Sequence, residues 1–138
     1  MTCQYAILTE YIGLRVDFKM EAPMPGPAPP ARPQARIVLT SAANPEEANR
    51  LARTLVEERL AACATLVPGV HSVYRWDGQI ETSEETLLLV KTGPDQLSAL
   101  EARLQELHSY QTPEFLVLPV ESGSSFYLDW LQASLQKP

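Results

Sequence analysis

The side chains of this sequence that suit catalysis or metal binding include Cys63, His71 and His108, and Tyr110 and Glu114 follow His108 closely. A thiolate suits Cu(I) and imidazole suits Cu(II), while a cysteine beside a histidine can also form a nucleophile and base pair. Which of these chemistries is available depends on how the fold places the three side chains relative to one another.

Hydrophobic periodicity predicts six elements of regular structure and a short terminal helix. The order β-α-β-β-α-β predicts an α+β fold, the ferredoxin-like antiparallel sandwich, in which two helices cover one face of a four-stranded sheet. In chain order we expect a strand at 37–40, a loop at 41–44, a helix at 45–62, strands at 64–76 and 79–91, a helix at 94–107, an edge strand at 115–120, and an extra C-terminal helix capped by Ser124 or Ser125.

The two middle strands predict a hairpin that is longer than its own domain. Asp77-Gly78 between them is typical of a type I′ turn, in which both central residues need positive φ. A strand over 64–76 spans roughly 43 Å, whereas a helix over 45–62 covers only about 27 Å. Because an overhanging hairpin exposes unpaired backbone, we expect a closed oligomer with the tip residues Tyr74 and Trp76 at a subunit interface.

Cys63 and His108 are not expected to meet within one subunit. Cys63 follows the first predicted helix and His108 follows the second, and these helices run antiparallel, so the two side chains belong to opposite ends of the domain, roughly 20 Å apart. Cys63 is then interpreted as a small core hydrophobe. His71 lies within a strand of the hairpin, where a single histidine is typical of a surface or interface.

His108 has two interpretations. It ends a helix at the same end of the domain as the 41–44 loop and the hairpin tip, so that His108, Tyr110 and Glu114 line one cleft that holds a metal or small ligand. In this interpretation the carboxylate of Glu114 orients the His108 ring. Alternatively, His108 compensates the dipole at the end of its helix and Tyr110 packs a turn.

Charge and composition restrict the partners. The 138 residues carry a formal net charge of −6, which argues against nucleic acid and anionic membranes as partners. Two cysteines are too few for a disulfide framework, so a reducing cytoplasm is the simplest compartment. Residues 1–35 contain a proline-rich stretch and are predicted to be a disordered N-terminal extension, followed by one folded domain over 36–138.

Several spaced motifs carry a resemblance to a known family. They are RLAAC at 59–63, PGV at 68–70, YRWDGQIE at 74–81, Lys91-Thr92 and HSYQTPE at 108–114. Over about residues 36–135 the sequence resembles the CutA family of divalent-cation tolerance proteins. The resemblance implies a homotrimer of ferredoxin-like subunits, distantly PII-like in shape, that is associated with copper and other divalent metal ions.

Two departures from the family pattern concern the metal. The family usually has His-Pro-Tyr where this chain has His108-Ser109-Tyr110. Copper sites proposed in some members use a cysteine at the end of the first strand and two adjacent histidines, positions that correspond here to Thr40 and Leu107-His108. The resemblance therefore implies Cu(II) as a cofactor with His108 as its one retained ligand, and with Thr40, Tyr110 and Glu114 nearby.

The function expected from these observations is binding or sensing of divalent metal ions by a cytoplasmic homotrimer, without catalysis. The alternative is a PII-like signalling trimer that binds a small effector between subunits. Hydrolases of the acylphosphatase type share the predicted topology, but their chemistry needs glycine-rich backbone donors at a helix start. Residues 41–47 contain no glycine and place Glu46 and Glu47 there.

Overall fold

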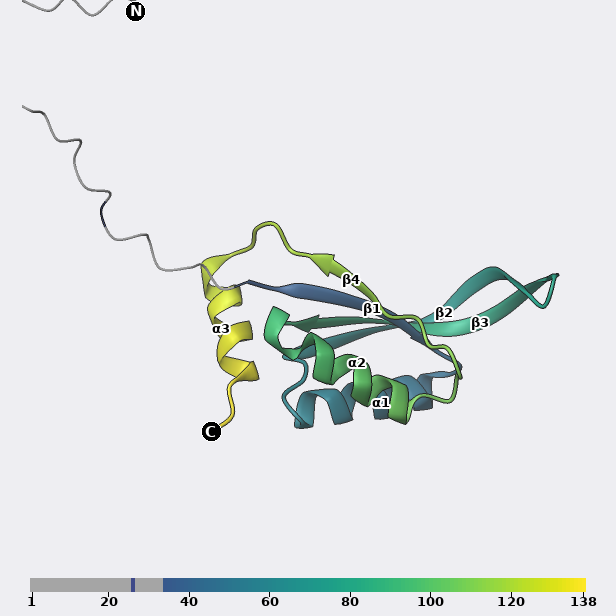
Figure 1. Ribbon diagram of the computed structural model, residues 1–138, viewed down its shortest axis with the longest axis horizontal. Coiled ribbons are helices and arrows are strands. Elements are labelled where there is room, and N and C mark those ends of the chain that lie inside the picture. Colours follow the sequence, from purple (N-terminus) through teal and green to yellow (C-terminus); the bar gives the residue numbers. More distant parts are fainter. Residues whose placement is uncertain (1–25, 27–33) are drawn as a thin grey trace, which may run out of the picture. The chain divides into compact units, whose positions relative to one another are not determined.

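A four-stranded antiparallel sheet carries two helices on one face and a third helix at one end (Figure 1). The computed structural model describes residue 26 and residues 34–138, so most of the predicted N-terminal extension lies outside the described residues. The elements are β1 (Arg36–Ala42), α1 (Pro45–Glu57), β2 (Cys63–Trp76), β3 (Gln79–Thr92), the 3-10 turn η1 (Pro94–Gln96), α2 (Leu97–Leu107), β4 (Leu116–Pro119) and α3 (Ser125–Leu135).

The order of strands in the sheet is β2-β3-β1-β4, and every neighbouring pair is antiparallel. This order confirms the predicted sequence of elements and the edge position of β4. Alternate residues of the central strands, such as Val38 and Leu88, are fully buried against apolar side chains of α1 and α2. A smaller apolar cluster joins α3 to the residues that precede β1 and β2, and its members are Ala35, Ala62, Leu131 and Leu135.

The opposite face of the sheet is also apolar. Residues that pair across antiparallel strands point to the same face, and the register places Leu39 beside Leu89 and Leu116 in one row. The next row contains Leu118, which is 45% exposed. We call this surface the open sheet face, and its members are Ile37, Leu39, Ser41, Cys63, Thr65, Val67, Leu87, Leu89, Lys91, Leu116 and Leu118.

Helix α1 ends at Glu57, so the predicted extension of this helix to residue 62 is wrong. Arg59 adopts a φ of 58°, in the left-handed region, and the next two amides both donate to the carbonyl oxygen of Leu55. A residue with a Cβ pays roughly 1–2 kcal/mol for this conformation. Here the Arg59 side chain donates to the carbonyl oxygen of Ser134 in α3 at 3.1 Å, which offsets part of that cost.

The early end of α1 changes the position of Cys63. The amide of Ala62 already donates to Lys91 of β3, and Cys63 is the first residue of β2. Its side chain lies on the open sheet face, half-buried, and is not part of the core cluster. The interpretation of Cys63 as a core hydrophobe at the end of a helix is therefore wrong. The predicted 41–44 loop is also shorter, because β1 continues to Ala42.

The long hairpin is confirmed. Strand β1 pairs with β3 only as far as Thr86, and residues 70–85 continue beyond it as a two-stranded hairpin arm (Figure 1). Its turn has the two positive φ values expected of Asp77-Gly78, 45° and 76°. Trp76 is 57% exposed near the tip. The arm thus extends past the helices that support the rest of the sheet, while the oligomer expected from it stays a prediction.

Candidate functional site

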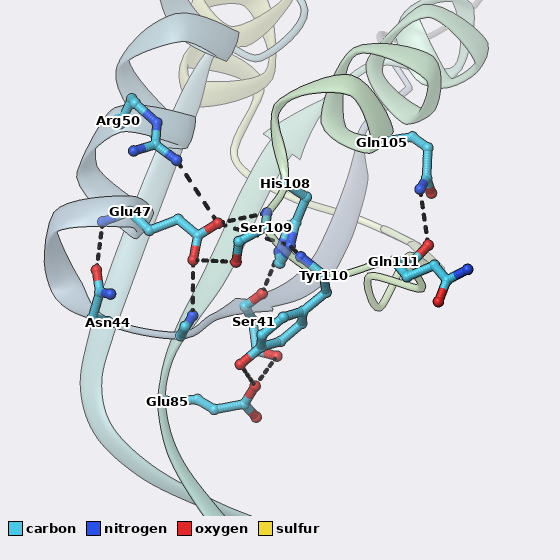
Figure 2. A network of polar contacts seen from close by, with 11 residues as sticks. Ser41, Asn44, Glu47, Arg50, Glu85, Gln105, His108, Ser109, Tyr110 and Gln111 are labelled. Atoms are coloured by element: carbon cyan, nitrogen blue, oxygen red, sulfur yellow. Dashed lines mark hydrogen bonds and ion pairs between the residues drawn. The ribbon is translucent and has the colours of Figure 1, made fainter. Parts of the chain in front are cut away.

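The predicted cluster around His108 lies at the base of the hairpin arm, where the end of β1, the start of α1 and the turn after α2 meet (Figure 2). Its members come from segments that are far apart in the sequence. The principal side chains are Ser41, Glu47, Glu85, His108, Ser109 and Tyr110.

Glu47 is both part of the cap of α1 and an acceptor for the turn after α2. The side chain of Asn44 accepts from the Glu47 amide at 2.8 Å, and the Glu47 carboxylate accepts from the Ala43 amide at 3.2 Å, an arrangement close to a capping box. The same carboxylate accepts from the amide of Ser109 at 2.8 Å and from its hydroxyl at 3.0 Å. One side chain therefore joins α1 to the 108–110 turn.

Glu47 retains its charge although only 5% of it is exposed. Burial raises the pKa of this carboxyl, but the hydrogen bonds from Ser109 and Ala43 outweigh burial and lower the pKa below its ordinary value of 4.5. Arg50, which is mostly exposed, lies 3.8 Å away. The carboxylate is thus stabilised mainly by donors that the local backbone and Ser109 supply.

Both ring nitrogens of His108 have partners inside the chain. Nε2 lies 2.8 Å from the carbonyl oxygen of Ser41, to which it donates, and Nδ1 accepts from the amide of Tyr110 at 3.0 Å (Figure 2). These partners assign the neutral tautomer with its hydrogen on Nε2. The side chain is fully buried, and its Nδ1 lies 3.9 Å from a carboxylate oxygen of Glu47.

Tyr110 connects this turn to the hairpin arm. Its hydroxyl donates to the Glu85 carboxylate at 2.8 Å, which also accepts from Ser41 at 3.1 Å and from Ser72 at 2.5 Å. Glu85 is only 7% exposed. Burial and the neighbouring Glu85 carboxylate raise the pKa of Tyr110, so its hydroxyl keeps its proton and remains a donor at neutral pH.

The other predicted site residues are placed less centrally. Thr40 is fully buried, and its hydroxyl has no hydrogen-bond partner among residues 34–138. Glu114 is exposed. The His108 ring, which Glu114 was predicted to orient, is oriented by backbone groups of Ser41 and Tyr110. The carboxylate that does lie beside His108 is Glu47, which our sequence analysis assigned only to the helix start. The Asn44-x-x-Glu47 spacing was the available signal for it.

The cluster does not fit a divalent metal ion in this arrangement. The lone pair of Nδ1, which is the one His108 could offer a metal, accepts from Tyr110 instead. Within residue 26 and residues 34–138 no group of three or more His, Cys, Asp or Glu side chains is placed to hold a metal ion. Coordination by His108 would require the Tyr110 amide to leave the ring, and His108 as a ligand stays a prediction.

Comparison with known proteins identifies close relatives. The family described as CutA1 divalent ion tolerance protein matches residues 36–134, which run from the first residue of β1 to the second-last residue of α3. The divalent-cation tolerance protein CutA of Pectobacterium atrosepticum is 47% identical over 102 residues, which are 74% of this chain and 93% of that protein. Two solved structures agree with the fold.

The crystal structure of CutA from Xylella fastidiosa has a TM-score of 0.73 at 38% identity and covers 74% of this chain and 98% of that one. The divalent cation tolerance protein (Cut A1) from Thermus thermophilus has a TM-score of 0.69 at 45% identity and covers 70% of this chain and 94% of that one.

The lowered pKa of Glu47 predicts a specific acid sensitivity. A carboxyl whose pKa is lower in the folded chain stabilises the fold above its ordinary value of 4.5, and this contribution is lost as pH falls through the folded value. We expect the free energy of unfolding, measured with urea between about pH 5 and pH 3, to fall less steeply in Glu47→Gln than in the wild type. Glu46→Gln, in the same helical turn but exposed, is the control and should keep the wild-type slope. A wild-type slope in Glu47→Gln would contradict this account.

Proposed function

The chain belongs to the CutA1 family of divalent ion tolerance proteins, and from this membership we propose that it is a cytoplasmic homotrimer of ferredoxin-like subunits that binds or senses divalent metal ions, Cu(II) among them, and has no catalytic activity. The main support for the proposed assembly is the apolar character of the open sheet face. The aliphatic residues Leu116, Leu39 and Leu89 form a row across β4, β1 and β3 there, whereas antiparallel sheets that face water are polar on that side.

A closed ring of copies is supported by the kinds of surface available, and three is the number that the family resemblance implies. The hairpin arm, the β4 edge and the open sheet face are different surfaces of one chain. Contacts between unlike surfaces are heterologous, and they form closed rings when the rotation between copies closes. In the proposed trimer the arm of one copy lies against its neighbour, which covers Tyr74 and Trp76 and leaves no free edge.

The proposed metal site uses exposed groups from more than one copy. The buried cluster at His108 is satisfied internally, and no single described chain segment gathers three ligands. His71 lies on the arm opposite Glu84, both are exposed, and no hydrogen bond to the His71 ring occurs within residues 34–138. Imidazole with carboxylate suits Cu(II), and neighbouring arms would supply the remaining ligands.

The compartment is proposed from cysteine usage. Cys63 is a free thiol, as expected in a reducing compartment. Within the part of the chain that the structure describes, none of the helices has the length and apolar character needed to cross a membrane.

We expect the wild-type protein to sediment as a particle of three times 15.3 kDa, and Leu118→Glu to sediment as a monomer. A charge in the middle of an apolar interface leaves an unpaired ion buried, which the assembly cannot tolerate. Val56→Glu on α1 is the matched control, because Val56 is 39% exposed, against 45% for Leu118, and lies away from the open sheet face. A monomeric wild type, or a Leu118→Glu trimer as stable as Val56→Glu, would contradict the proposed assembly.

A calorimetric Cu(II) titration of the wild-type oligomer tests the metal. We expect binding in the wild type, unchanged affinity in His108→Ala, and at least a tenfold loss in His71→Ala, because only the second change removes an imidazole with an available lone pair. The reverse pattern, loss in His108→Ala and retention in His71→Ala, would place the metal at the buried cluster instead. Absence of Cu(II) binding in the wild type would remove copper from the proposal.

The second candidate, a PII-like trimer with a small effector between subunits, is favoured by Lys91. This half-buried lysine lies on the open sheet face, where it donates to the hydroxyl of Thr65, and it forms no ion pair within residues 34–138. A partly buried lysine without an acid partner is a position for an anionic group. We expect ATP, if it is such an effector, to bind the wild type and not Lys91→Met. No heat on ATP addition to the wild type would remove the main support for this candidate.

A further inference from the structure

We infer that Tyr110 is a latch that fixes the direction of the hairpin arm through its hydrogen bond to Glu85, and that assembly depends on this latch. The inference rests on the proposed homotrimer for its consequence in assembly, but the latch itself is a property of one chain. Four observations support it, and Figure 2 shows Tyr110, Glu85 and the neighbouring side chains of Ser41, Glu47, His108 and Ser109.

The first observation is how few bonds hold the arm. Beyond the last pair between β1 and β3, Ala42 with Thr86, the strand residues of the arm, 70–76 and 79–85, pair across the hairpin with one another and not with β1. Among the described residues outside the arm, two side chains donate hydrogen bonds to it. They are Ser41 and Tyr110, and both donate to the Glu85 carboxylate. The side-chain hydrogen bonds that join the arm to the rest of the described chain therefore share one acceptor, the Glu85 carboxylate.

The second observation is a bend point at the same level. The register of β2 against β3 shifts between Val67 and Val70, and Gly69 there has a φ of 70°. A bulge bends a strand and increases its local twist, so the direction of the arm is determined where this irregularity lies. Glu85 pairs with Val70 directly beside the bulge. A contact to Glu85 thus acts at the position where the arm can change direction.

The third observation is that Tyr110 is itself held in place. Its amide donates to Nδ1 of His108, its ring lies 4.9 Å from the imidazole, and Ser109 donates twice to Glu47. Two of these donors come from Ser109, and proline at this position would have neither the amide hydrogen nor the hydroxyl. The turn is therefore fixed to β1 and α1 before it reaches the arm.

The fourth observation is the charge of Glu85. This nearly buried carboxylate forms no ion pair within residues 34–138, and its stabilisation comes from the hydroxyl groups of Ser41, Ser72 and Tyr110. Hydrogen bonds to a charged acceptor are stronger than those between neutral groups, and an under-satisfied buried carboxylate is costly. Loss of the Tyr110 hydroxyl would draw water to Glu85 and free the arm.

Tyr110→Phe removes only the hydroxyl, and Tyr127→Phe is its control, because Tyr127 lies on α3 and its hydroxyl donates no hydrogen bond within residues 34–138. Hydrogen exchange followed by mass spectrometry is compared in the full chain carrying Leu118→Glu, so that subunit contacts do not protect the arm. We expect amides of residues 70–85 to exchange about tenfold faster or more in Tyr110→Phe, with α1 and β1 unchanged. In the otherwise wild-type chain we expect the trimer dissociation constant to rise about tenfold or more.

Glu85→Gln gives an independent test if Tyr110→Phe loosens the whole chain, because the amide keeps the size of the side chain but accepts fewer hydrogen bonds. It should loosen the same residues, 70–85. Arm exchange as slow as in the Tyr127→Phe control, in both variants, would overturn the latch. A wild type that is monomeric at every concentration would contradict the proposed homotrimer and with it the role of the latch in assembly, while arm exchange would still decide whether Tyr110 fixes the arm.

Discussion

Two nearly buried carboxylates at the base of the hairpin arm, Glu47 and Glu85, set the constraint on which this end of the structure depends. An ionised carboxylate is tolerated in such a place only when donors replace the water it has lost. Glu47 receives backbone amides and a serine hydroxyl, and Glu85 receives three hydroxyls. These donors come from β1, β2 and the turn after α2, so satisfying two charges aligns several segments of the chain.

The same constraint explains why a histidine in this cluster does not behave as its residue type suggests. Both ring nitrogens of His108 form hydrogen bonds, Nε2 to the Ser41 carbonyl and Nδ1 from the Tyr110 amide. The ring therefore orients the turn that carries the latch. The open sheet face and the hairpin arm both expose apolar side chains to water, and a partner that covers them would remove this apolar surface from water. The proposed assembly, in which exposed groups of the arms contact the metal, would cover both surfaces.

The sequence predicted the features that follow from local patterns. Asp77-Gly78 predicted the turn, runs of apolar residues predicted the strands, and the start of α1 was predicted at Pro45. The end of α1 was mispredicted because no glycine marks it: Arg59 occupies the left-handed position, and its side chain bonds to α3, a contact between residues that are remote in sequence. Glu47 and Ser109 were missed as partners for the same reason, since their contact depends on the packing of α2 against α1.

The central claim, that the groups at the base of the arm satisfy one another and leave His108 no lone pair for a metal, is tested most directly by nitrogen NMR of the histidine side chains. In protein labelled with ¹⁵N-histidine, we expect His108 to carry its hydrogen on Nε2 and to keep both nitrogen shifts when Zn²⁺ is added, whereas the shifts of His71 move. A hydrogen on Nδ1, or a shift of His108 on addition of Zn²⁺, would contradict the account.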